Sequence, residues 1–261
     1  MTGNDRSDKV PIHTIRALTS HARSPRANRQ LGFALAFVAG AINAGGFLAL
    51  RQYTSHVTGI ISSAADQLVL GATGLVLDAL GALLSFLLGA ACTAIMVNHA
   101  RRRALASEYA LPLLLEAVLL LVFGMLGARL AAVEGLFVPA TVMLLCFMMG
   151  LQNALVTKLS QAEIRTTHMT GIVTDIGIEL GKLLYWNADA SRPRVDADRA
   201  RLAMLCTLLL CFFAGGAGGA LGFQAIGYLS TVPLALFLCL LAIVPVLDDL
   251  GILSRRARQE R

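Results

Sequence analysis

The chain has 261 residues, of which 56% are hydrophobic and 15% are charged, and its mean hydropathy is +0.69. These values exclude an ordinary soluble domain and are typical of a multi-pass membrane protein. The formal net charge of +6 does not predict a nucleic-acid partner, because Lys and Arg collect in the cytoplasmic loops of membrane proteins without one.

Residues 1–30 are polar, basic and proline-bearing, and they lack the apolar core of a signal peptide. We therefore expect a disordered cytoplasmic tail, followed by a first span that remains as an anchor. A second basic cytoplasmic tail is expected at 251–261. The region between the tails divides into a first membrane repeat at 31–130 and a second at 131–250.

Six apolar segments, each about 20 residues long, are expected to cross the bilayer as helices, which predicts an all-α polytopic membrane protein. The segments are 31–50, 79–98, 109–128, 135–157 and two within the uncharged run 202–247, which is divided near Gly227 to Pro233. Glu116 interrupts one of them, and an acidic side chain at that depth should face protein or water rather than lipid.

The basic clusters predict the topology. The two tails, the run Arg101 to Arg103 and the arginines of 192–201 should all be cytoplasmic. If the stretch 57–77 crossed the membrane, three crossings would separate the N-terminal tail from Arg101. The two basic segments would then lie on opposite sides, against the rule that basic segments are cytoplasmic. If it does not cross, every basic cluster lies inside, with both termini cytoplasmic.

One phrase occurs twice, as "YTSHVTGI" at 53–60 and "RTTHMTGI" at 165–172. The similar strings "GAINA" and "GLQNA" precede the two copies. Each copy leads into a helix at 57–77 or 169–186 that is too polar for a lipid-facing span, so we expect it to re-enter the membrane or lie at its surface. Thr54 or Ser55, and Thr166 or Thr167, are the expected N-cap residues.

The layout is span, short polar helix, span, span, repeated once. Because three spans is an odd number, the second repeat should be inverted relative to the first, as in many transporters and channels. The two short helices then approach one site from opposite sides of the membrane. Their free N–H groups favour anions or polar oxygens, and the histidines titrate near neutral pH.

The residues expected to bind a solute come from both phrases, from the strings before them and from the short helices. They are Asn43, His56, Thr58, Gly59, Asp66, Gln152, Asn153, Thr167, His168, Thr170, Gly171 and Asp175. Structural roles remain open for each of them: the histidines are alternatively helix caps, and Asn43, Gln152 and Asn153 are alternatively hydrogen-bonding contacts between helices. Asp175, Glu179 and Lys182 share one helix face, which we interpret as a solvated cytoplasmic surface.

The string "AGGAGGALG" at 214–222 has small residues at the spacing that brings helices close together. Gly215, Gly219 and the glycines around them are therefore expected to lie at a helix crossing.

The two phrases, with the "GLQNA" string, resemble the YoaK-like family of bacterial integral membrane proteins, a domain of unknown function. The resemblance covers roughly residues 30–250. It implies a polytopic inner-membrane protein and no established substrate. Many members of the family have Asp-Ala where this chain has Asn43 and Ala44, so the resemblance does not support a proton-carrying carboxylate at that position.

Three kinds of function remain open. A small-solute transporter or channel is favoured by the inverted duplication. A lipid-modifying enzyme would use His168 as a base oriented by Asp175, but no nucleophile or metal-ligand set completes such a site, so we expect no enzyme. A non-transporting sensor or assembly partner would act through its basic tails. We expect no cofactor and no metal. The expected partners are the lipid bilayer, a small polar solute or anion, and a candidate second copy of the chain.

Overall fold

The computed structural model describes residues 25–50, 53–103, 105, 108–130, 134–159, 169–187, 193–243 and 246, and all regular structure in them is helical. Helices α2 (Pro25–Leu50), α3 (Val57–Val69), α4 (Thr73–Arg102) and α5 (Ala110–Leu130) come from the first half of the chain. Helices α6 (Glu134–Leu159), α7 (Met169–Leu184), α8 (Arg199–Ile226) and the 3₁₀ helix η1 (Gly227–Ser230) follow. A further helix occupies residues 231–243.

Five helical stretches are long and apolar enough to cross a membrane, which confirms the all-α class and a multi-pass membrane character. They are Arg29–Ala49, Thr73–Arg102, Ala110–Gly127, Pro139–Leu159 and Arg199–Ile243. The last has 45 residues, about twice what a bilayer requires. It is interrupted at η1, where Gly227 has a φ of 57° that a residue with a side chain rarely adopts. The interruption lies where the sequence predicts a division between two spans.

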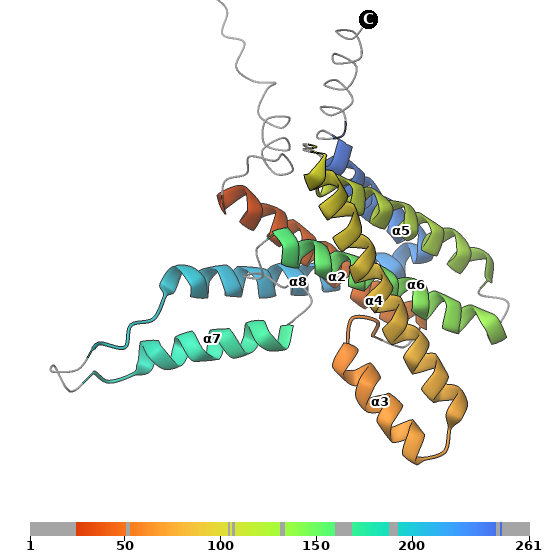
Figure 1. Ribbon diagram of the computed structural model, residues 1–261, viewed down its shortest axis with the longest axis horizontal. Helices are drawn as coiled ribbons and strands as arrows, with labels where there is room; N and C mark the ends of the chain where they lie inside the picture. Colours follow the sequence, from red (N-terminus) through yellow and green to blue (C-terminus); the bar gives the residue numbers. More distant parts are fainter. Residues whose placement is uncertain are drawn as a thin grey trace, which may run out of the picture.

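The first short helix is shorter than predicted, and the following span is longer. α3 ends at Val69, a turn follows in which Gly71 has a φ of 73°, and α4 begins at Thr73 instead of at residue 79. The 30-residue α4 therefore forms a tight hairpin with α3. α7 and α8 form a second hairpin, and Figure 1 shows the two hairpins extending in different directions from a common centre.

The centre is built from two closely packed helix pairs, α2 with α8 and α4 with α6. Each pair crosses at glycines that lie against a carbonyl of the facing helix. Gly40 contacts the carbonyl of Phe212, and Gly215 contacts that of Phe37. In the second pair, Gly89 contacts the carbonyl of Phe147, and Gly150 contacts that of Phe86. Each of these four phenylalanines stands three residues before one of the four glycines, in the pattern F-x-x-G. The pattern thus marks the crossing point on every helix of the centre.

The predicted close packing of "AGGAGGALG" agrees with these contacts. Gly215 lies on Phe37 and Gly219 on the backbone of Ala41, where α8 crosses α2. Gly218 and Gly222 have looser surroundings. α2 and α6 also touch, and the buried Gln152 side chain donates from Nε2 to the carbonyl of Leu35 at 3.2 Å. The centre of the protein is therefore held by backbone proximity and a few polar bonds, as is common between membrane helices.

Candidate functional site

A cavity of about 830 Å³ lies beside the crossing helices, at the start of both short helices. Side chains of six helices and of the segment before α3 line it. They are Asn43, Ser55, His56, Val57, Thr58, Gly59, Phe86, Asn153, Met169, Thr170 and Phe212. The cavity has the size of a small-molecule site. Among the described residues, His56 is the only acidic or basic residue that lines it.

The first turn of α3 offers backbone donors to this cavity. His56 is the N-cap residue with φ −86° and ψ 67°, and its side chain makes no capping hydrogen bond. The N–H of Val57 donates to Ser55 and that of Ile60 donates to His56. Among the described residues, the N–H groups of Thr58 and Gly59 have no partner. Such groups at a helix start favour polar oxygen atoms and negative charge.

The expected N-cap role of Thr54 or Ser55 is wrong. Ser55 instead donates from Oγ to the Asn43 Oδ1 at 2.8 Å, which joins the segment before α3 to α2. Thr54 is buried, and its hydroxyl has no partner in the described part of the chain. The Asn43 carboxamide, which lines the cavity, is thereby oriented by Ser55.

Aromatic rings continue from His56 toward α2. The Tyr53 ring lies 5.6 Å from that of His56 and stacks on Phe47 at 4.3 Å between centroids. These contacts fix the imidazole at the edge of the cavity.

Asn153 of α6 supplies an acceptor to the same cavity. Its Oδ1 is shielded from solvent and has no hydrogen-bond partner among the described residues. Its backbone carbonyl accepts from Thr157 Oγ1 at 2.7 Å. A buried amide oxygen without a partner is costly, and a polar solute in the cavity would satisfy it.

Six of the twelve residues expected to bind a solute line the cavity: Asn43, His56, Thr58, Gly59, Asn153 and Thr170. Gly171 lies in the first turn of α7 but is not part of the lining. Gln152 points to α2, as described above. Asp66 is exposed on α3 and Asp175 contacts α8. Thr166, Thr167 and His168 lie outside the described residues.

Sequence reasoning missed Phe86 and Phe212, which contribute apolar lining from α4 and α8. The F-x-x-G pattern was the available signal, because it places each phenylalanine one turn before a crossing glycine.

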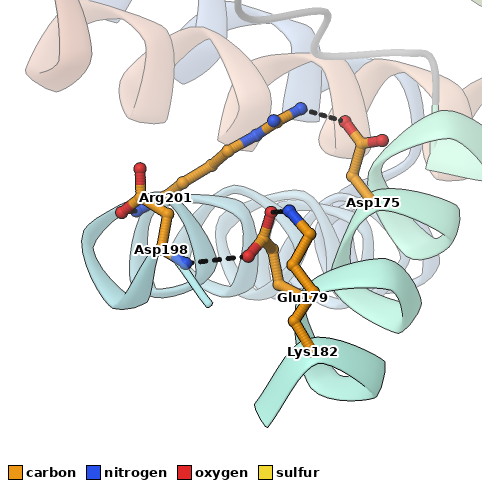
Figure 2. Close-up of polar contacts among 5 residues, drawn as sticks. All are labelled: Asp175, Glu179, Lys182, Asp198 and Arg201. Atoms are coloured by element: carbon orange, nitrogen blue, oxygen red, sulfur yellow. Dashed lines mark hydrogen bonds and ion pairs between the residues drawn. The ribbon is translucent and has the colours of Figure 1, made fainter. Parts of the chain in front are cut away.

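A polar network joins α7 to the start of α8 (Figure 2). Arg201 donates to Asp175 at 3.0 Å, and Lys182 donates to Glu179 at 2.8 Å. The second oxygen of Glu179 accepts from the backbone N–H of Asp198 at 2.9 Å, and Asp198 caps α8 through the N–H of Arg201. The expected solvated face is therefore wrong for Glu179, which is 1% exposed. The start of α8 bonds to it through Asp198, which the helix pattern of α7 alone could not indicate.

Glu179 is expected to make the stability of this hairpin depend on pH. The hydrogen bond from Lys182, with that from Asp198, holds the pKa of Glu179 below its usual value. Because the folded state has the lower pKa, this stabilisation is present at neutral pH and is lost as the pH falls through the acid range. We expect Glu179→Gln to lower the unfolding temperature by a few degrees at pH 7. The unfolding temperatures of this variant at pH 7 and at pH 4 should therefore differ less than those of the parent.

The fluorescence of Trp186, the single tryptophan, reports this transition because it follows α7 directly. Asp175→Asn is the matched control, since its ion pair with Arg201 is more exposed and should contribute little. If both variants changed the unfolding temperature and its pH dependence equally, Glu179 would not be the source of the pH dependence.

Comparison with protein-family models gives one match, described as "Protein of unknown function (DUF1275)", over residues 31–244. The chain belongs to the DUF1275 family. The match covers most of the chain, including both phrases and every helix from α3 to α8, and the resemblance to YoaK-like proteins is confirmed. No curated protein and no solved structure matches the chain significantly. Membership of the DUF1275 family therefore assigns no activity, and the cavity is the basis for a functional proposal.

Proposed function

We propose that this protein is a transporter or channel that moves a small polar solute across the membrane through the cavity between two inverted repeats. The first repeat comprises α2 to α5. The second comprises α6, α7, α8 and the helix at 231–243, which makes six spans when Arg199–Ile243 is counted as two. The observation that carries the proposal is the pairwise lining of one cavity by corresponding residues of both repeats.

Reciprocal helix contacts support the inverted repeat. If α2 corresponds to α6 and α4 to α8, the pair α2–α8 must recur as the pair α6–α4, and these are the two most extensive helix contacts. The correspondence extends to single residues. Gly40 lies on Phe212 as Gly150 lies on Phe86, and Gly215 lies on Phe37 as Gly89 lies on Phe147. Exchanging the two repeats therefore reproduces the same set of glycine contacts at the crossing.

The cavity lining follows the same correspondence. Asn43 pairs with Asn153, Thr58 with Thr170, Val57 with Met169 and Phe86 with Phe212. A site on the axis between inverted repeats is accessible in turn from either side when the repeats rock against each other. A site that binds the same solute from either side of the membrane is expected to have equivalent polar and apolar residues in both repeats.

The chemistry of the lining favours a neutral polar solute or a small anion. Backbone N–H groups at the start of α3 and the carboxamides of Asn43 and Asn153 offer donors, while Phe86 and Phe212 add apolar surface. The described part of the lining contains no acidic residue, which disfavours cations.

The basic clusters support an inner-membrane location with both termini cytoplasmic. Reporter fusions at Ala106 and Asn187 test this topology, and an external signal at either position would refute it.

A non-enzymatic role is proposed as well. Asp175, which a lipid-modifying reaction would need beside His168, is engaged by Arg201 of α8. A covalent reaction would also require a nucleophile. Among the described lining residues, Ser55 is the only Ser or Cys, and it is hydrogen-bonded to Asn43.

Flux measurements test the proposal directly. Purified protein in liposomes is assayed with chloride, formate, urea and glycerol, and at least one should enter faster than in empty liposomes. Asn153→Ala and His56→Ala are expected to reduce that flux by about tenfold, because each removes a polar partner of the desolvated solute. Asn98→Ala is the matched control, since Asn98 is an exposed residue of α4 outside the cavity. Flux that neither cavity variant alters would refute a path through the cavity.

A further inference from the structure

Glu116 is a carboxylic acid in the interior of the helix bundle. It lies on α5, about 9 Å from the start of the helix at Ala110, and its side chain is 0% exposed. Leu113, Ala117 and Leu120 surround it on the same helix face and are fully or almost fully buried. Neither carboxyl oxygen has a hydrogen-bond partner among the described residues. A charge in such surroundings would be strongly disfavoured.

Gln152 of α6 lies at the same depth as Glu116. The hydroxyl of Tyr109 donates to the carbonyl of Lys158 at 3.3 Å, which aligns the start of α5 with the end of α6. Glu116 is seven residues after Tyr109, and Gln152 is six residues before Lys158, so both lie about 10 Å from this contact on helices that run in opposite directions. Gln152 is fully buried, and its Oε1 also has no partner in the described residues. A proton on Glu116 would supply the donor that these oxygens lack.

The titratable groups nearest to Glu116 along α5 and its neighbours lie about two helical turns away from it. Tyr228 of η1 packs on Phe123, about two turns from Glu116, and the cluster of Arg101, Glu108 and Lys158 lies about two turns in the other direction. None of the described charged groups forms a hydrogen bond or an ion pair with Glu116. Its charge is therefore not compensated by a neighbouring cation.

We propose that Glu116 is a proton-binding site in the membrane interior and that Gln152 accepts the hydrogen bond of the bound proton. A proton fits better than a metal cation, because a cation requires several oxygen ligands at once, and the described residues hold no group of three or more His, Cys, Asp or Glu side chains that could bind one. Gln152 also donates to Leu35 of α2, and the next residue, Asn153, lines the cavity. Release of the proton would thus disturb α6 at the solute site. The proton site itself does not depend on the proposed transport.

Infrared spectroscopy of the full chain in liposomes tests the site. At pH 7 we expect a carbonyl band of a protonated carboxylic acid that shifts in ²H₂O and disappears in Glu116→Gln. Gln152→Leu should retain the band and move it to higher frequency, since the acid loses its acceptor. This second variant leaves Glu116 unchanged, so it identifies the acid even where Glu116→Gln fails to fold.

Glu179→Gln is the control, because Glu179 is an ionised carboxylate and its replacement should leave the acid band intact. The proposal is overturned if Glu116→Gln leaves that band unchanged or removes a carboxylate band instead. A carboxylate band that changes on addition of sodium would likewise overturn it, in favour of a cation site. None of these outcomes depends on finding the transported solute.

Discussion

Gly150→Ala is expected to abolish most of the folded protein. The Cβ of an alanine at this position would overlap the carbonyl oxygen of Phe86, and because that atom belongs to the backbone of α4, no side-chain rotation can relieve the overlap. The helices would have to separate, which exposes small-residue contacts along the crossing. Destabilisation of at least about 3 kcal/mol is expected from overpacking of this kind. Size-exclusion chromatography of a fluorescent fusion measures the loss of monodisperse protein.

Gly177→Ala provides the matched control. Gly177 lies within α7, and a methyl group there would meet nothing within 4 Å. Alanine is favoured over glycine in a helix interior by about 1 kcal/mol, so this variant should be as stable as the parent or more stable. Gly40→Ala should behave like Gly150→Ala, because Gly40 meets Phe212 in the corresponding way. A folded Gly150→Ala protein with an unchanged unfolding temperature would contradict the crossing.

The spans were predictable because a bilayer imposes a simple length and polarity rule on the helices that cross it. The division at Gly227 and the separate short helices α3 and α7 also followed from composition. The start of α4 at Thr73 was not predictable, because the apolar stretch 74–77 could belong to the end of α3 or to the start of α4. Only the turn at Gly71, with its positive φ, decides where α3 ends.

Half of the expected site residues line the cavity because the repeated phrase marks the beginning of both short helices. Contacts set by tertiary packing were beyond the sequence. The bond from Asp198 to Glu179 and the orientation of Gln152 toward Leu35 depend on which helices lie side by side. A hydrophobic pattern specifies the buried face of a helix but not its neighbour. Phe86 and Phe212 look like ordinary core residues until α4 and α8 are brought to the cavity.

Filling the cavity should stop solute flux without unfolding the protein. Thr58 and Thr170 line the cavity from corresponding positions on α3 and α7, and both side chains are exposed to it. A tryptophan at either position can extend into open space instead of displacing a packed core. We expect Thr58→Trp and Thr170→Trp each to reduce the initial rate of uptake on the order of tenfold or more.

Thr174→Trp separates blockage from a general effect of a large side chain on α7. Thr174 lies one turn beyond Thr170, is exposed and does not line the cavity, although its hydroxyl donates to the Thr170 carbonyl at 2.8 Å. Its replacement should leave the uptake rate close to that of the parent, while all three variants retain the parent unfolding temperature. Because the two cavity threonines lie in different repeats, a rate reduced by Thr58→Trp alone would indicate a path through the first repeat only. Reduction by both variants is what a shared path requires, since a solute between the repeats must pass the start of α3 and the start of α7.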